Sequence, residues 1–283
     1  MPIRKFPPVL LGCVLAVVFA SPAQALAPFQ MGLHEPEAAG ADAGRYDAIR
    51  DANASLSRLT VYWARHVPGG TERPAGFDPR NPADPNYNWT EIDSFVRAMD
   101  ARNVEPFITV LEAPPWAEGD DAADRANRFG QEPGVYRVNA KEFGDFMHAM
   151  ATRYSGSFRD AAGNTLPRVR YFQMWNEPNF GQYLVSQRKA DIPPIYVRML
   201  NAGYDAVKGV SRSNVVIAAG FGPYGNNQRA TDVEPQVFMR SMLCLTGSGG
   251  RKLRDNRRCR VPKPKFDVWA QHPYTFGGTP RTK

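Results

Sequence analysis

The stretch that decides the fold is Val215-Val216-Ile217-Ala218-Ala219, which is apolar at every position. A strand without alternation between apolar and polar residues is typical of a parallel sheet that helices cover. Similar short runs, rich in β-branched and aromatic residues, recur along the chain and predict further strands. We expect six strands in all, at Phe29–Leu33, Leu56–Trp63, Glu105–Leu111, Val169–Trp175, Val215–Phe221 and Phe266–His272.

Longer segments with helical periodicity separate these strands. They predict helices at Ala41–Asn53, Glu91–Asn103, Ala140–Tyr154, Ile195–Val210 and Gln236–Leu245. Thr90 and Asn139 are the predicted N-caps of the second and third helices, each with an acidic residue three positions later. Pro193-Pro194 suits the first turn of the fourth helix, where a missing amide hydrogen does no harm.

Strands that alternate with helices indicate an α/β fold, and the length suits a (β/α)8 TIM barrel. The pattern holds only about six strands and five helices, because long loops use much of the chain. We therefore expect an incomplete barrel in which strands seven and eight are missing. Composition agrees with one globular domain over residues 26–283, since 43% of residues are hydrophobic and 22% charged.

The N-terminus has the features of a secretory signal peptide over residues 1–25. Two basic residues, Arg4 and Lys5, precede an apolar run from Val9 to Ala20, and small residues stand before a cleavage site after Ala25. A lipoprotein signal at Cys13 is the weaker alternative, because that cysteine lies inside the apolar run. No later stretch is long and apolar enough to span a bilayer. We expect a secreted protein, extracellular or periplasmic, without membrane attachment once the signal is removed.

The positive net charge of +7 is concentrated in residues 251–265, which contain eight basic residues against Asp255. A nucleic-acid surface would spread basic residues over a face and interleave aromatic ones, and this segment has no aromatic residue before Phe266. We expect a solvated loop rather than a nucleic-acid site, with binding to an anionic cell-wall polymer as the alternative.

Cys244 precedes this basic segment and Cys259 lies within it, and an isolated pair in an oxidising compartment is expected to form a disulfide. We interpret the disulfide as structural. A connection from helix to strand runs on the N-terminal face of a barrel. The basic loop is therefore expected on the face opposite the active edge.

The chemistry-bearing motif is Trp175-Asn176-Glu177-Pro178-Asn179, at the carboxyl end of the fourth predicted strand. Catalytic groups of parallel barrels lie at that end of the strands. A carboxyl group can protonate a glycosidic leaving oxygen, and a neighbouring amide can bind the adjacent sugar hydroxyl. The alternative is that Glu177 is only a surface loop residue.

This motif resembles the acid/base motif of clan A glycoside hydrolases, especially cellulase-like family 5 and xylosidase-like family 39. Arg58 on the second strand resembles the arginine of the clan that supports the nucleophile, and Gln271-His272-Pro273-Tyr274 is similar to the His-x-Tyr pair lining the sugar site. The resemblance implies a retaining two-glutamate glycosidase with Glu177 as acid/base, Asn176 as substrate binder and a poly- or oligosaccharide substrate.

The sequence departs from that family pattern at the nucleophile. The family carries it on the seventh strand, which we expect to be absent from this chain, so the chain is expected to be inactive as it stands unless another carboxylate replaces the nucleophile. A retaining mechanism needs two carboxyl groups about 5–5.5 Å apart. Glu35, after the first strand, and Glu112, after the third, are the candidates for a replacement. The alternative function is a non-catalytic carbohydrate-binding barrel fragment or pseudoenzyme.

Aromatic side chains at the same edge suit stacking on sugar rings. Trp116 and Tyr274 are the candidates, with packing an equal alternative for Trp116. His34 and His66 follow strands and are possible hydroxyl contacts. Residues 220–225 match the Gly-x-Gly-x-x-Gly pattern, but Pro223 removes an amide from the phosphate cradle and no helix follows, which argues against a dinucleotide. No metal or organic cofactor is predicted.

Overall fold

The computed structural model describes residues 30–35, 38, 43–119, 133–225, 231–247 and 253–274. The predicted signal peptide, residues 1–25, lies outside these ranges and stays a prediction. In the described part of the chain, no helix is long and apolar enough to cross a membrane.

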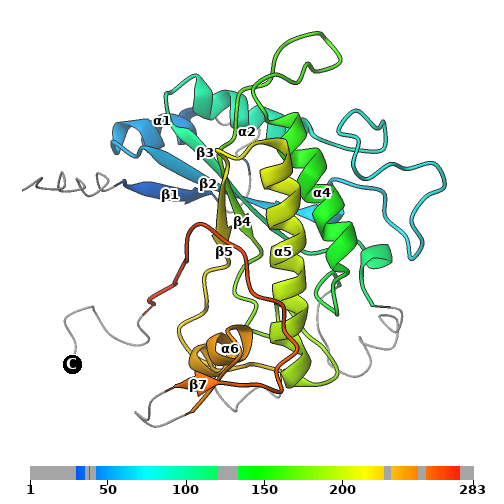
Figure 1. Cartoon of the computed structure of the whole chain (residues 1–283). Helices are drawn as coiled ribbons and strands as arrows, with labels where there is room; N and C mark the ends of the chain where they lie inside the picture. The colour runs from blue at the N-terminus through cyan, green and yellow to red at the C-terminus, as the bar shows by residue number, and fades with distance from the viewer. Residues whose placement is uncertain are drawn as a thin grey trace, which may run out of the picture.

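A five-stranded parallel sheet forms the centre of the fold, and its strands lie side by side in chain order (Figure 1). The strands are β1 (Gly32–Glu35), β2 (Leu56–Tyr62), β3 (Glu105–Leu111), β4 (Tyr171–Met174) and β5 (Val215–Ala218). Parallel neighbours in sequential order, each joined by a helical crossover, are the arrangement of a (β/α) barrel. The predicted α/β fold and incomplete barrel are therefore confirmed.

The sixth predicted strand, Phe266–His272, is not a continuous strand. It meets β5 and the residues after it only through two parallel bridges, Ile217 with Val268 and Phe221 with Gln271. The carboxylate of Asp267 accepts the amide hydrogen of Val216 at 2.8 Å. This side chain takes a donor that a regular ladder would use, so the pairing is interrupted although the segment still follows β5.

Five α-helices are present among the described residues, close to the predicted positions: α1 (Ala43–Asp51), α2 (Thr90–Asp100), α4 (Ala140–Arg153), α5 (Ile192–Val210) and α6 (Pro235–Met242). The predicted cap of α4 is confirmed, since the Asn139 side chain accepts the amide hydrogens of Lys141 and Glu142. The predicted cap of α2 is wrong. Thr90 is the first helical residue, and its amide donates to the side chain of Asn88.

Helices α4 and α5 lie next to each other along one side of the molecule (Figure 1). Their backbones approach closely at Gly144, where an added Cβ would lie 3.1 Å from the Cβ of Ala202. Buried aromatic rings fill the space between α4 and the sheet, with Trp63 stacked on Phe146 at 5.2 Å. Both helices begin at the end of the sheet where the strands finish (Figure 1).

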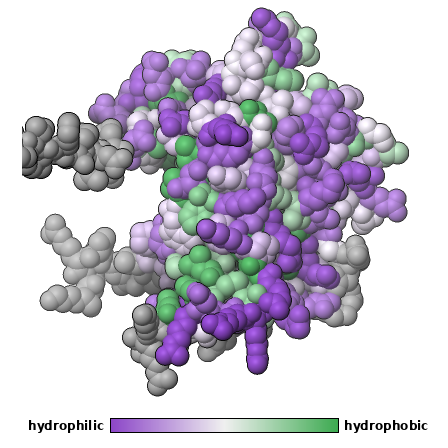
Figure 2. Space-filling model, in the orientation of Figure 1, coloured by the Kyte–Doolittle hydropathy of each residue, from purple (hydrophilic) through white to green (hydrophobic). Residues whose placement is uncertain are grey.

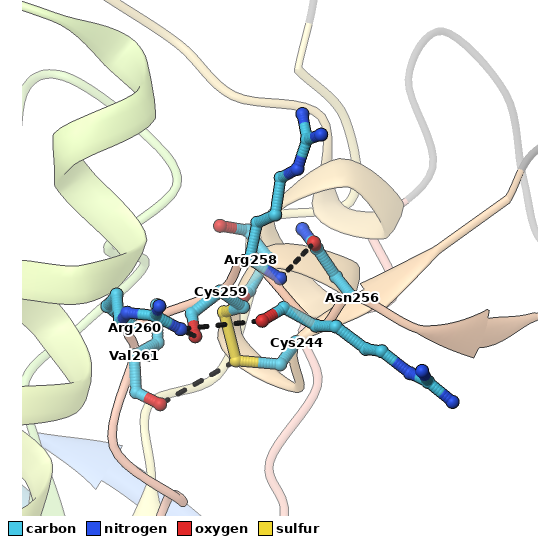
Figure 3. Close-up of a disulfide and its surroundings, with 8 residues drawn as sticks. Cys244, Asn256, Arg258, Cys259, Arg260 and Val261 are labelled. Carbon is cyan, nitrogen blue, oxygen red and sulfur yellow. Dashed lines mark hydrogen bonds between the residues drawn. A yellow bond between two sulfur atoms is a disulfide. The ribbon is translucent and has the colours of Figure 1, made fainter.

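The disulfide between Cys244 and Cys259 is present and closes a hairpin made of β6 (Leu245–Thr246) and β7 (Arg254–Asp255) (Figure 3). The predicted placement of this hairpin on the N-terminal face is wrong. Ser241, whose carbonyl oxygen lies 4.0 Å from the sulfur of Cys259, lines a pocket together with Lys189 and Pro193 at the start of α5.

The reason for this placement is the length of α6. Eight residues of helix span only about 12 Å and do not return the chain to the far face. The return is made instead by an extended segment beside α5, where Lys263 and Lys265 bond Asn201 and Asp205. The hairpin consequently lies at the end of the molecule where the strands finish, as Figure 1 shows for α6 and β7.

Candidate active site

Glu177 occupies a tight turn directly after β4. Trp175 and Glu177 both have positive φ angles, 76° and 37°, which are rare for residues other than glycine. The amide of Glu177 donates to the carbonyl of Gly220 after β5, and the indole of Trp175 donates to the carbonyl of Tyr183 at 2.7 Å. Such conformations persist only where the surroundings hold them, and they cluster at functional sites.

The carboxyl group of Glu177 is buried, with 8% of the residue exposed, and it is hydrogen-bonded to a histidine. Nδ1 of His272 lies 2.7 Å from Oε1 of Glu177. The imidazole fits because Gly220 has no side chain: a Cβ there would lie 2.2 Å from Nε2 of His272. Gly220, the first glycine of the Gly-x-Gly-x-x-Gly pattern, therefore makes room for the imidazole ring in this fold.

Asn176 is held by Arg58, the arginine of β2. The guanidinium donates through Nη2 to Oδ1 of Asn176 at 3.0 Å and through Nε to the hydroxyl of Thr109 at 2.7 Å. Burial lowers the pKa of Arg58, and the nearby charge of Glu177 opposes that shift. Arg58 thus fixes the orientation of the Asn176 side chain through its amide oxygen.

His34 belongs to the same polar group, through β1. Its Nε2 lies 2.8 Å from the hydroxyl of Thr60, and partial burial together with the charges of Arg58 and His272 lowers its pKa to about 4. His66, the other histidine considered, lies apart from this cluster. It is buried and bonds the carbonyl of Asn88 through Nδ1 at 2.9 Å.

The two candidate aromatic residues have different surroundings. Tyr274 is 64% exposed and its ring lies 5.8 Å from that of His272. Trp116 donates its indole hydrogen to the carbonyl of Pro68 and packs edge-on against Trp63. Trp116 is thus part of an aromatic cluster in the wall, while Tyr274 has the open ring face that stacking requires.

Sequence reasoning missed Tyr183, which lies near Glu177 and Tyr274. Burial raises the pKa of the Tyr183 hydroxyl, and the negative charge of Glu177 raises it further. Tyr183 lies six positions beyond Glu177 in a loop without regular structure. Hydrogen bonds such as the one from Trp175 to the carbonyl of Tyr183 hold this loop in place, and they leave no signal in the sequence pattern.

The two carboxylates considered as replacements for a nucleophile are both near strand ends. Glu35 is buried and forms an ion pair with Arg45 of α1 at 2.6 Å. Glu112 is half-buried, has a φ of 56°, and accepts the amide hydrogen of Ala64 through its carbonyl. Within the described ranges, no group of three or more His, Cys, Asp or Glu side chains is arranged to hold a metal ion.

No protein-family model matches the sequence, and no curated relative is found. Solved structures with a similar fold include a glucosidase from Croceicoccus marinus, at 17% identity and a TM-score of 0.43 over 69% of this chain and 38% of that one. A family 39 glycoside hydrolase from Bacteroides cellulosilyticus is 21% identical, with a TM-score of 0.39 over 68% of this chain and 32% of that one. The endoglucanase Cel5A of Thermotoga maritima is 15% identical, with a TM-score of 0.41 over 68% of this chain and 51% of that one.

All three structures are of glycoside hydrolases, the class of enzyme that the sequence motifs resemble. The chain spans about a third to a half of the length of each. Similarity at this level assigns neither activity nor substrate. The fold assignment depends on the strand order of the sheet itself.

Proposed function

We propose that this chain is a glycoside hydrolase domain that hydrolyses O-glycosidic bonds of poly- or oligosaccharides, with Glu177 as the proton donor. The observation that carries the proposal is the buried carboxyl of Glu177, hydrogen-bonded to His272 at the carboxyl end of the sheet. Catalytic groups of parallel barrels lie at this end.

The surrounding residues suit the same reaction. A carboxylic acid donates its proton to the leaving oxygen as the bond to the sugar breaks, a contribution of about 10²–10⁴ in rate. Arg58 fixes the side chain of Asn176, which supports a hydrogen bond from its amide to the hydroxyl beside the reacting carbon. His272 fixes the carboxyl group, and Tyr274 offers an apolar face to a sugar ring.

The stereochemical course that we propose is retention, with a second carboxylate as nucleophile about 5–5.5 Å from Glu177. The family resemblance assigns that role to a glutamate of a seventh strand. Of the two alternatives, Glu35 is the weaker, because its ion pair with Arg45 fixes the carboxylate and lowers its nucleophilicity. Glu112 follows β3, the strand next to β4, where contact with sugar hydroxyls is the more suitable role.

A second candidate function is saccharide binding without turnover. The exposed ring of Tyr274 favours it, since an open aromatic face binds a sugar whether or not a nucleophile is present. Hydrolysis distinguishes the two functions, because a binding domain retains the sugar and releases no new reducing ends.

We also propose export of the chain through the signal peptide at residues 1–25. The disulfide between Cys244 and Cys259 is of the kind that persists in an oxidising compartment. Mass determination of the protein recovered from a secreting host tests this proposal. A mature N-terminus at Leu26 supports it, and a retained Met1 would refute it.

The experiment for the activity is a hydrolysis screen of the full chain on β-linked oligosaccharides, beside Glu177→Gln and Glu72→Gln. Glu72 is exposed, so its variant controls for the loss of one carboxylate. We expect release of reducing ends that falls by about 10²-fold or more in Glu177→Gln and not in Glu72→Gln. Equal activity of all three proteins would remove Glu177 from the mechanism.

A further inference from the structure

A polar cavity of about 670 Å³ lies between the starts of α4 and α5, outside the group around Glu177. Its basic side chains are Arg137, Lys141, Arg188 and Arg198, and Asp191 is the one acidic residue among those that line it. Four cations around one hollow create a positive potential that draws anions into it.

The cations are only partly committed to partners within the chain. Arg188 forms a surface ion pair with Asp191 at 2.8 Å, and Lys141 pairs with Asp145 at 2.6 Å. The pair between Arg188 and Asp191 is exposed and therefore weak, so an incoming anion competes with it readily. Asp145 is buried, so Lys141 is the more firmly committed of the two cations. Arg198 is exposed on the second turn of α5, and among the described residues no carboxylate forms an ion pair with its guanidinium.

The attraction comes from side chains rather than from the start of α4. The Asn139 side chain already accepts the amide hydrogens of Lys141 and Glu142. What the cavity offers is guanidinium groups, whose planar donor pairs match the two oxygens of a carboxylate.

The cavity lies on the same rim as Glu177. The loop from β4 to α5 begins with the candidate acid and later supplies Ser186 and Arg188 to the cavity lining. The negative charge of Glu177 raises the pKa of the Tyr183 hydroxyl. Tyr183 lies three residues before Ser186, and three residues of extended chain span at most about 11 Å. The shared loop thus places the cavity on the side of the molecule toward which a run of sugar units bound at Glu177 could extend.

The hairpin beyond α5 adds positive charge at this end of the molecule. It carries Arg254, Arg257, Arg258 and Arg260, and Figure 3 shows the side chain of Arg258 extending away from the disulfide. Exposed apolar residues Val237, Leu243 and Leu253 lie on α6 and the hairpin. Figure 2 shows hydrophobic residues gathered near α6 with hydrophilic ones around them.

We propose that the cavity is a subsite for a uronic-acid residue, so that the substrate class of the Glu177 site is an acidic, carboxylate-bearing polysaccharide. This inference rests on the proposed glycosidase function for the sugar run that crosses Glu177. The carboxylate of the bound unit takes the donors of Arg198 and Arg188.

The test compares two hexasaccharides that differ only at C6, a β-1,4-linked oligoglucuronate and cellohexaose. Their affinities for the full chain are measured by calorimetry at low and at moderate salt. We expect the oligoglucuronate to bind at least about tenfold more tightly, with the difference shrinking as salt screens the charges. Equal affinity for both sugars, or stronger binding of cellohexaose, would overturn the proposal.

The matched variants are Arg198→Gln at the cavity and Arg212→Gln beyond the far end of α5, each of which removes one exposed arginine. We expect Arg198→Gln to weaken oligoglucuronate binding about fivefold to tenfold and to leave cellohexaose binding unchanged. If both variants weaken oligoglucuronate binding equally, the preference for this sugar comes from the net charge of the protein. That result would refute the subsite.

Binding is measured without turnover, so the outcome is separable from the proposed activity. Charge-selective binding by a chain that hydrolyses nothing supports the subsite and refutes the glycosidase. Hydrolysis of both sugars with equal affinity supports the glycosidase and refutes the subsite.

Discussion

Nδ1 of His272 lies 2.7 Å from Oε1 of Glu177, although 95 positions separate the two residues in the chain. Glu177 follows β4, which pairs with β5. His272 lies on the segment that pairs with the other side of β5, so the hydrogen bond reaches across the end of β5. Because the carboxyl group is buried, this hydrogen bond helps to determine where its proton is presented.

The first prediction concerns the space that Gly220 leaves for the imidazole. In Gly220→Ala the new Cβ, 2.2 Å from the present position of Nε2, displaces His272. We expect hydrolysis to fall about tenfold or more, as in His272→Ala, since small misplacements of catalytic groups are costly.

The control for this prediction is Gly209→Ala in α5, where nothing lies within 4 Å of an added Cβ. This variant is expected to keep full activity and to gain about 0.5–1 kcal/mol of stability from the better helix former. A Gly220→Ala protein as active as the Gly209→Ala protein would show that the imidazole position does not matter.

The second prediction concerns the fork of Arg58. Lysine lacks the planar guanidinium whose Nε and Nη2 donate separately to Thr109 and Asn176, so Arg58→Lys loosens the Asn176 side chain. We expect kcat/KM to fall about tenfold, or about 1.4 kcal/mol, while Arg212→Lys leaves it unchanged. Steady-state kinetics on one oligosaccharide measure both, and an unaltered kcat/KM in Arg58→Lys would mean that Asn176 orientation is set elsewhere.

The third prediction concerns the disulfide. Cys244→Ser opens a loop with a sequence separation of 15, and the loss of that constraint costs on the order of 3 kcal/mol in the free energy of unfolding. We expect a lower melting temperature with sugar binding intact at temperatures where the variant is folded. A selective loss of binding at unchanged melting temperature would give the hairpin a direct role instead.

The fourth prediction concerns pH and His66. Burial lowers the pKa of His66 below its ordinary value of 6.5, so the unfolded chain binds the proton more readily. Stability contributed by the neutral ring is present above pH 6.5 and is lost as pH falls from 6.5 toward the lowered pKa. Thermal melts between pH 7.5 and 5 are expected to show a smaller drop in His66→Gln than in the wild type. Parallel curves would assign the pH dependence to other groups.

The strands and helices were predictable because hydrophobic periodicity is local. The segment Glu105–Leu111 has the predicted bounds, and the five helices differ from prediction by a few residues at their ends. The exception among strands is Phe266–His272, where the side chain of Asp267 competes for a backbone donor. Competition of that kind depends on a neighbour 51 positions away and leaves no periodic signal.

The candidate site was predictable in its residues but not in its contacts. The motif around Glu177 and the residues Arg58 and His272 come together as expected from strand ends of one sheet. Their partners Thr109 and Tyr183 were not predicted, because a single hydroxyl has no pattern of its own. The position of the hairpin was predicted wrongly for a related reason, since barrel connections alternate between faces only when each helix is long enough to return the chain.

The central claim is that Glu177 donates a proton to a glycosidic leaving oxygen, and leaving-group dependence tests it most directly. Rates of the full chain and of Glu177→Ala are measured on two glycosides of one sugar, with a dinitrophenyl and a methyl leaving group. Dinitrophenolate departs without a proton and methoxide does not. We predict a loss on the order of 10²–10⁴ for the methyl glycoside and a far smaller loss for the dinitrophenyl glycoside. Equal losses for both substrates would contradict the assignment of Glu177 as the acid.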